Sequence, residues 1–156
     1  MGDARNTVRR ATVEDAADVA RLLHDFNTEF SEPTPGVAIL TERARQMVGD
    51  GELTMLLVGE GPDGLAQMRF LSSIWSSAPS CYLEELYVAP SRRGRGMGRA
   101  LLEATIDAAR EVGADHIDLN TGETDTAARA LYESAGFTNR EGKDDGPRML
   151  YYERYL

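Results

Sequence analysis

The sequence predicts an α/β fold of the mixed α+β kind, with helices packed on the faces of one central sheet. Three observations lead to this class. Apolar segments with strand character alternate along the chain with amphipathic helical segments. At residues 82–102 an apolar strand leads through a loop rich in Gly and Arg directly into a helix. The chain has 156 residues, 42% apolar and 28% charged, which suits a single domain over 1–156 with its own core.

The first half of the chain is expected to form two helices and a hairpin. Thr12 can cap the first helix, with Asp15 three residues later as a shortened capping box. Apolar residues then recur at helical spacing from Val19 to Phe26. The expected elements are a strand at 7–10, a helix from Thr12 to near Phe30, a helix at 41–48, and paired strands at 53–59 and 65–72.

The second half is expected to continue the sheet. A loop containing Ser, Trp and Pro leads into the next strand, and Gly113 is placed to end the helix that follows. The expected elements are a strand at 81–88, a helix at 96–111, a strand at 116–120, a helix at 125–135, and closing strands at 137–140 and 148–155. This order predicts a mixed sheet with helices on its faces.

The loop at residues 89–96 is expected to bind an anion. Backbone N–H groups at a helix start lack intrahelical partners, and the helix dipole adds positive charge there. Glycines let a ligand approach the backbone closely, and the arginines at 92, 93, 95 and 99 can bind phosphate oxygens. A Walker loop is excluded because Gly-Lys-Ser/Thr is absent. A dinucleotide fingerprint is excluded because the glycines at 94, 96 and 98 have a different spacing and follow a longer loop.

The same loop fits a third phosphate-binding pattern, Arg/Gln-x-x-Gly-x-Gly/Ala, at Arg93, Gly96 and Gly98. This segment resembles the pyrophosphate loop of the GNAT superfamily of acyl-CoA-dependent N-acetyltransferases. Residues 82–88 look like the family's fourth strand, and residues 131–137 look like its "LYE..GF" segment. The resemblance implies a mostly antiparallel mixed sheet, splayed between its fourth and fifth strands and flanked by helices. It also implies acetyl-CoA as the co-substrate, held in that opening.

The resemblance further implies which residues contact the cofactor. The main chain of the fourth strand is expected to bind the pantetheine arm, because the amides of that arm mimic a β-strand. Many members have Asn seven residues before the family's tyrosine, where this chain has Asp125. Asp125 keeps the helix-capping acceptor but lacks the amide donor, which Asn120 could provide. The expected cofactor-binding residues are Leu86, Tyr87, Val88, Arg93, Gly94, Arg95, Gly96, Met97, Gly98, Arg99, Asn120 and Asp125.

Acetyl transfer to an amine needs a neutral amine and a leaving thiolate that is protonated or stabilised. Tyr132 matches the family position whose phenol serves as general acid near the cofactor sulfur. Glu84 and Glu85 lie on the strand beside the expected thioester and are the candidate bases. Successive strand residues point to opposite faces, so at most one of the two glutamates is expected to face the cleft. Glu84 is slightly favoured, and a bulge would invert the choice.

The acceptor side is implied by the resemblance alone. In the family the first helices and the loop before the fourth strand usually form the acceptor wall, which here means Phe26, Glu29, Phe30 and Trp75. Aromatic rings and a carboxylate suit a cationic amine. The favoured function is N-acetylation of a small-molecule primary amine by direct attack in a ternary complex. The alternatives are acetylation of a protein N-terminus or lysine, and a non-catalytic acyl-CoA-binding sensor.

The composition limits the partners and the location. A formal net charge of −9 argues against nucleic acid as a partner. Cys81 is the sole cysteine, so no intrachain disulfide can form, and its spacing from the two histidines is unlike that of a metal site. No apolar run is long enough for a bilayer and no leader opens the chain, so a cytoplasmic protein without a membrane partner is expected. The aromatic residues Tyr151, Tyr152 and Tyr155 suggest either a homodimer contact or burial within one chain.

Overall fold

The computed structural model describes residues 6–156. The chain forms two compact units, which meet in sequence between Leu119 and Asn120. The first unit holds the sheet and three long helices, and the second holds one helix and the C-terminal segment. The single domain expected over 1–156 stays a prediction.

The described residues of the first unit form a five-stranded sheet in the order β1-β2-β3-β4-β5. The first four strands pair antiparallel with their neighbours, and β5 lies parallel to β4. The strands are β1 (Val8–Arg10), β2 (Thr54–Val58), β3 (Gly64–Leu71), β4 (Ser80–Val88) and β5 (His116–Asp118). The expected α/β fold with a mixed, mostly antiparallel sheet is therefore confirmed.

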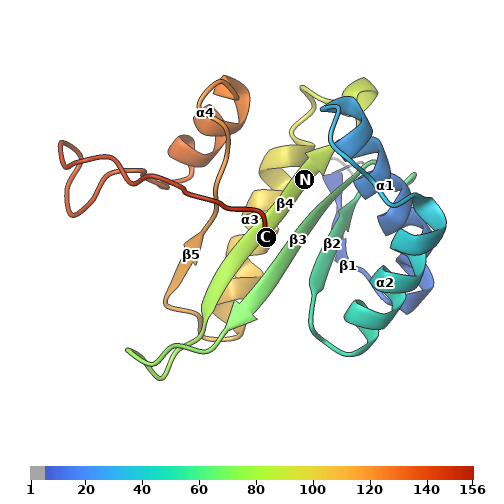
Figure 1. Cartoon of the computed structure of the whole chain (residues 1–156), viewed down its shortest axis with the longest axis horizontal. Coiled ribbons are helices and arrows are strands. Elements are labelled where there is room, and N and C mark those ends of the chain that lie inside the picture. The colour runs from blue at the N-terminus through green and yellow to red at the C-terminus, as the bar shows by residue number, and fades with distance from the viewer. Residues whose placement is uncertain (1–5) are drawn as a thin grey trace. The chain divides into compact units, whose positions relative to one another are not determined.

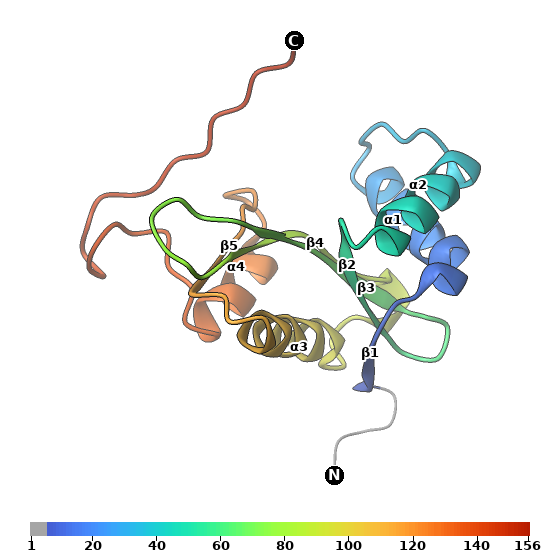
Figure 2. The same ribbon diagram turned by 90° about the horizontal axis from the view of Figure 1, so that it is seen from below.

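Helices cover both faces of this sheet (Figure 2). Two helices, α1 (Ala16–Glu29) and α2 (Val37–Gly49), lie on one face, and α3 (Met97–Glu111) lies on the other. The core under α1 and α2 is built from apolar side chains that include Val19, Leu22 and Leu65. Because strand residues alternate, Ala66 and Met68 of β3 face α3 instead.

The helix boundaries follow from local chemistry. The short helix η2 (Val13–Asp15) precedes α1, and the Thr12 N–H donates to the Asp15 carboxylate at 2.8 Å, as the capping box predicts. Helix α2 begins four residues earlier than expected, because Gly36 has a φ of +94° and directly precedes it. Helix α3 ends where expected, with Gly113 at a φ of +75°.

The sheet opens between β4 and β5 (Figure 1). Among the described residues, β5 pairs with β4 at Ser80, Cys81 and Tyr82 alone. From Leu83 to Val88, β4 continues without a partner strand on that side. The splay expected between the fourth and fifth strands is confirmed, and it exposes one edge of β4 for most of its length.

A β-bulge interrupts the pairing of β3 with β4. Gln67 pairs with Glu85 and Met68 pairs with Leu83, so Glu84 is the extra residue on β4. Residues on either side of the bulge therefore follow different alternation patterns. The sequence did not specify this interruption, because it depends on the register between two strands.

The second unit contains α4 (Thr126–Ser134), preceded by Asp125 as its N-cap. The Asp125 carboxylate accepts a hydrogen bond from the Ala128 N–H at 3.0 Å, which confirms its capping function. The strands expected at 137–140 and 148–155 are wrong. Within the second unit a single bridge joins Arg140 to Arg148. The intervening residues 141–147 form bends and a turn, and a lone bridge leaves most backbone groups of a strand unpaired.

Candidate functional site

The loop after β4 brings backbone N–H groups together at the start of α3. The short helix η3 (Pro90–Arg92) follows β4, and Gly94 and Gly96 then adopt φ angles of +72° and +84°. Gly96 is the N-cap of α3, so the N–H groups of the first turn point out of the helix without intrahelical partners. No described residue lies within 4 Å of a side chain built on Gly94. The loop therefore presents backbone N–H groups at the start of α3 and has open space beside Gly94.

Arg93 is bound by groups of the first unit. Its two terminal nitrogens donate to both carboxylate oxygens of Glu29, at 2.8 and 2.6 Å. Its Nε donates to the main-chain oxygen of Val88 at 2.9 Å. Its guanidinium carbon lies 5.6 Å from the centroid of the Tyr87 ring. The side chain of Arg93 thus connects the loop to α1 and to the end of β4.

A second set of contacts holds the loop from the other side. The Ala89 N–H donates to the main-chain oxygen of Asp63 at 2.8 Å, and Arg92 pairs with the Asp63 carboxylate at 3.3 Å. The Asn6 side-chain amide donates to the main-chain oxygen of Arg95 at 2.9 Å. The loop is therefore fixed by residues that are distant from it in sequence.

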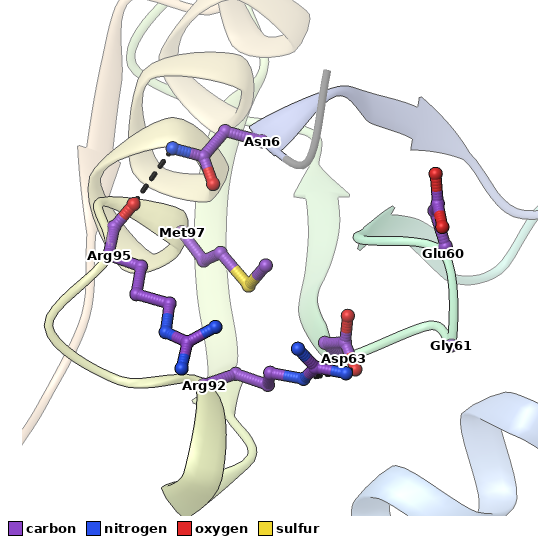
Figure 3. A pocket seen from close by; sticks show the side chains of 7 residues that line it. All are labelled: Asn6, Glu60, Gly61, Asp63, Arg92, Arg95 and Met97. Carbon is purple, nitrogen blue, oxygen red and sulfur yellow. Dashed lines mark hydrogen bonds and ion pairs between the residues drawn. The ribbon is translucent and has the colours of Figure 1, made fainter. Parts of the chain in front are cut away.

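A cavity of about 560 Å³ lies against these contacts (Figure 3). Arg92 and Arg95 contribute guanidinium groups, and the turn between β2 and β3 contributes the carboxylates of Glu60 and Asp63. The remaining lining residues are Asn6, Gly61 and Met97. The cavity is therefore lined by both positive and negative side chains, and two of them, Arg92 and Asp63, form an ion pair.

The open edge of β4 presents main-chain groups. The Tyr87 oxygen lies 2.7 Å from the position of a side chain built on Gly64, so this carbonyl points toward β3. Neighbouring carbonyls of a strand alternate in direction. The Val88 oxygen therefore points to the open edge, where Arg93 binds it, and Leu86 presents its main chain on the same edge. Of the three residues at the end of β4 that are expected to bind the cofactor, Val88 thus has a main-chain oxygen that already accepts a hydrogen bond.

The bulge places both glutamates of β4 on the face covered by α1 and α2. Glu85 lies opposite Gln67, which shares a face with the core residue Leu65. Glu84 accepts hydrogen bonds from the side chains of Gln67 and Arg69, which share that face. The alternation of faces on which the choice between the two glutamates was based is interrupted, because the extra residue of a bulge breaks it, and which of them faces the cleft stays a prediction.

The two carboxyl groups differ in their surroundings. The Arg69 Nε donates to Glu84 at 2.5 Å, and a terminal nitrogen of Arg69 donates to Glu52 at 2.9 Å. For Glu85, burial and then the nearby charge of Glu84 raise the pKa to about 7. A carboxyl group with this pKa can gain or lose a proton near neutral pH.

Three of the four expected acceptor residues lie together at the C-terminal end of α1. Phe26 stacks on Tyr87, with ring centroids 4.8 Å apart, and belongs to the core. Phe30 contacts the Phe26 ring edge-on at 5.4 Å and is 54% exposed. Glu29 is paired with Arg93. Trp75, which is 95% exposed, lies in the loop that precedes β4, at the opposite end of that strand from Val88.

A family model supports the interpretation of this site. The model of the Acetyltransferase (GNAT) family matches residues 18–137, which include strands β2 to β5, the loop and α4. The chain belongs to the Acetyltransferase (GNAT) family. The resemblance seen in the loop motif is therefore confirmed at the level of the family.

Similar proteins include two curated acetyltransferases and one solved structure. A mycothiol acetyltransferase of Beutenbergia cavernae is 34% identical over 69% of this chain and 37% of its own length. An aminoglycoside N(6′)-acetyltransferase type 1 of Stenotrophomonas maltophilia is 30% identical over 96% of this chain and 94% of its own. A crystal structure from Arthrobacter sp. FB24, provisionally named an acetyltransferase, superposes with a TM-score of 0.89 and 43% identity over 100% and 99% of the two chains. The chain spans about a third of the mycothiol acetyltransferases that it matches.

Of the other expected site residues of this GNAT chain, Gly98 and Arg99 lie in the first turn of α3, and the rest belong to the second unit. Tyr132 lies in α4, and its ring centroid is 6.0 Å from that of Phe137. Asn120 follows β5, which ends at Asp118 rather than at residue 120. Asp125 uses its carboxylate to cap α4. The expected functions of all three in cofactor binding or catalysis stay predictions.

Sequence reasoning missed several residues that shape the site. Asn6 contacts the loop across 89 positions of sequence, and no local pattern marks it. Asp63 stands in a Gly-Pro-Asp-Gly segment that predicts a turn but no contact with the loop. Gln67 and Arg69 could have been noticed as polar residues at alternate positions of an apolar strand.

The described residues set two further limits. They contain no helix that is long and apolar enough to cross a membrane. They also contain no group of three or more His, Cys, Asp or Glu side chains arranged to hold a metal ion. The expected cytoplasmic location and the homodimer stay predictions.

Proposed function

We propose that this protein transfers the acetyl group of acetyl-CoA to a primary amine of a small molecule. One observation carries the proposal. The open edge of β4 leads directly into a glycine loop that ends at the start of α3, where the backbone N–H groups lack partners within the helix. In a member of the GNAT family this arrangement suits an acyl-CoA molecule along the strand, with its diphosphate at the helix start.

The residues present fit the phosphate part of the cofactor. Positive φ angles at Gly94 and Gly96 turn the backbone so that consecutive N–H groups converge. A Cβ built on Gly94 would lie more than 4 Å from the described atoms outside its chain neighbours, so the backbone is open to a ligand there. When bound, the cofactor would supply an activated acetyl thioester, and Leu86 would offer main-chain groups to its pantetheine arm.

Glu85 is the better candidate for the general base. Its pKa of about 7 lies close to the pH at which a base must accept a proton, whereas Glu84 is engaged by Arg69 and Gln67. In the proposed step the amine nitrogen bonds to the thioester carbon, and the carbon–sulfur bond breaks. Glu85 takes the proton released by the amine, directly or through water. This assignment reverses the slight preference for Glu84 that the sequence suggested.

Tyr132 is proposed as the general acid, on the strength of its position in the family motif. A phenol with an ordinary pKa near 10 donates a proton to a departing thiolate when it is well positioned. The leaving sulfur then departs as a thiol, and the charges in the step balance. This function requires the hydroxyl of Tyr132 to be near the reacting sulfur.

Small-molecule amines are the favoured acceptors for two reasons. The curated relatives reported above carry the names of mycothiol and aminoglycoside acetyltransferases. The half-exposed Phe30 ring, beside Glu29 at the end of α1, offers an aromatic surface to an amine cation. The contacts of Phe26, Glu29, Phe30 and Trp75 with the acceptor amine stay predictions.

The proposal is tested by measuring free-thiol release from acetyl-CoA with a panel of aminoglycosides, polyamines, amino-sugar thiols and peptides. We expect turnover with at least one small-molecule amine and saturation by acetyl-CoA. Preferred turnover of peptides would favour protein acetylation instead. Acetyl-CoA binding by calorimetry with no turnover across the panel would favour a sensor.

A further inference from the structure

The ion pair between Glu29 and Arg93 joins two residues that the sequence analysis places at different parts of the site. Arg93 was expected to bind phosphate, and Glu29 was expected to bind the acceptor amine. In the structure the guanidinium group uses two nitrogens on Glu29 and the third on the Val88 oxygen. All three nitrogens of Arg93 are therefore directed toward α1 and β4.

We propose that Glu29 is a positioning residue for the phosphate-binding loop and acts through Arg93. This inference rests on the proposed use of acetyl-CoA. Arg93 lies five residues after Val88 and three before Gly96, so its side chain ties the end of β4 to the loop. Glu29 then ties the same side chain to α1.

The end of α1 that carries Glu29 is packed against the core. Phe26, one turn before Glu29, stacks on Tyr87 and packs against the core cluster. The Glu29 side chain is 25% exposed, and the Arg93 guanidinium also lies over the Tyr87 ring. A two-pronged guanidinium–carboxylate pair fixes orientation as well as distance.

The opposite side of the loop is held independently. Asp63 binds both the Ala89 N–H and Arg92, and Asn6 binds the Arg95 carbonyl. The loop thus lies between two sets of contacts, with Glu29 and Arg93 on the side of α1. Holding the N–H groups in place before the diphosphate arrives lowers the entropy lost on binding.

Direct binding of phosphate by Arg93 is the alternative to positioning, and it predicts different effects of mutations on the affinity for acetyl-CoA. If Arg93 instead leaves Glu29 to bind phosphate, Glu29 competes with the cofactor, and its removal should strengthen binding. If Arg93 acts by charge alone, lysine should replace it well. A positioning function needs the planar fork of arginine, which lysine lacks.

The experiment measures acetyl-CoA binding by calorimetry for the wild type, Glu29→Gln, Arg93→Gln and Arg93→Lys. We expect Glu29→Gln to raise the Kd by about three- to tenfold, the scale of one well-formed ion pair. Arg93→Lys should weaken binding nearly as much as Arg93→Gln. The matched control is Glu42→Gln, which breaks the exposed ion pair with Arg45 on α2 and should leave the Kd unchanged.

Kinetics and a double variant separate positioning from folding and from substrate contact. For Glu29→Gln the KM for acetyl-CoA should rise, while kcat at saturation and the KM for the amine stay close to wild type. The effects of Glu29→Gln and Arg93→Gln should be far from additive in the double variant. Tighter binding by Glu29→Gln, full affinity in Arg93→Lys, or a change confined to the amine KM would overturn the proposal.

Acetyl-CoA binding by the wild type separates failure of the positioning function of Glu29 from failure of the proposed enzymatic function. If it fails to bind acetyl-CoA, the proposed function itself is wrong. If the wild type binds and Glu29→Gln binds equally well, the proposed function stands and the positioning function of Glu29 is wrong.

Discussion

Glu84 is the extra residue of the bulge in β4, and it shares with Glu85 the face of the sheet that α1 and α2 cover. Two adjacent carboxyl groups on one face repel each other when both are ionised. Arg69 and Gln67 donate hydrogen bonds to Glu84, whereas partial burial raises the pKa of Glu85 to about 7. Of the two carboxyl groups, Glu84 is therefore engaged in an ion pair with Arg69, and Glu85 has a pKa near neutrality.

Glu85→Gln should remove the ionisation that activates the amine. In the wild type kcat/KM should rise with pH through about 7, because Glu85 must lose its proton to act as a base. In Glu85→Gln this limb should disappear and activity at pH 7.5 should fall by about a hundredfold or more. The measurement is a pH–rate profile with one amine, so that the ionisation of the amine is common to both proteins.

Glu84→Gln is the matched variant for that profile. Removing the negative charge beside Glu85 should lower its pKa and move the limb to lower pH, with most of the activity retained. If Glu84→Gln abolishes the limb and Glu85→Gln keeps it, the assignment of the base is reversed.

Burial of Glu85 also makes a prediction about stability. Its pKa is raised on folding, so the folded state holds this proton more tightly than the unfolded state does. The resulting contribution to stability is complete below about pH 4.5 and is lost as the pH rises through about 7. Glu85→Gln should therefore melt at a higher temperature than the wild type at pH 8, and the advantage should vanish at pH 4. Equal melting temperatures at pH 8 would contradict burial as the cause of the raised pKa.

Gly96→Glu should abolish acetyl-CoA binding. The position has a φ of +84°, and a side chain there would begin 3.2 Å from the Asn6 amide nitrogen. A carboxylate beside the diphosphate adds repulsion, so we expect the Kd to rise by about a hundredfold or more. Calorimetry with acetyl-CoA is the measurement.

Gly113→Glu provides the control, because Gly113 has a similar φ of +75° but lies at the other end of α3. It should lose about 1–2 kcal/mol of stability from backbone strain and keep its affinity. Equal losses of affinity in the two variants would show that general destabilisation explains the effect.

The parts of the site that could be predicted are those whose residues are contiguous in the sequence. The glycines, the arginines and the helix start stand within residues 92–99, so their local chemistry already predicts a phosphate loop. The contacts that hold this loop join residues 64 and 89 positions apart, at Glu29–Arg93 and Asn6–Arg95. Such pairs depend on tertiary packing and leave no local signal.

The same difference between local pattern and tertiary contact explains which strands were predicted correctly. β4 was predicted because its apolar pattern is long, but its bulge depends on the register against β3. The closing strands at 137–140 and 148–155 were predicted from composition, yet a strand needs a neighbour for its backbone groups. In the described second unit that pairing is limited to Arg140 and Arg148.

Asp15→Asn should weaken the start of α1 in a pH-dependent way. The Arg9 side chain donates to both oxygens of Asp15, at 2.8 and 2.7 Å, and the Thr12 N–H also donates to it. These contacts, with Arg9 first, lower the pKa of Asp15 to about 2. Its stabilising effect is present above about pH 4 and is lost as the pH falls toward 2.

At pH 7 we expect Asp15→Asn to reduce the free energy of unfolding by about 1 kcal/mol, measured by urea denaturation. The difference from wild type should shrink as the pH falls from 4 to 2. Asp107→Asn, which breaks an exposed pair with Arg110, should change stability by less than about 0.5 kcal/mol. A constant difference between Asp15→Asn and wild type over this pH range would contradict the ion pair as its source.

Tyr132→Phe tests the proposed acid with the smallest change the side chain allows. Removing the hydroxyl leaves the ring, which contacts Phe137 within the second unit. If the hydroxyl protonates the departing thiolate, kcat should fall by about a hundredfold while the Kd for acetyl-CoA changes little, because the proton moves in the transition state alone. Tyr152→Phe, at a tyrosine that is 84% exposed, is the control and should keep its kcat. A thiolate of low basicity leaves without much help from a general acid. An acyl thioester of a more acidic thiol should therefore restore part of the rate that Tyr132→Phe loses. An unchanged kcat, or a loss of cofactor affinity equal to the loss of rate, would remove Tyr132 from the chemical step.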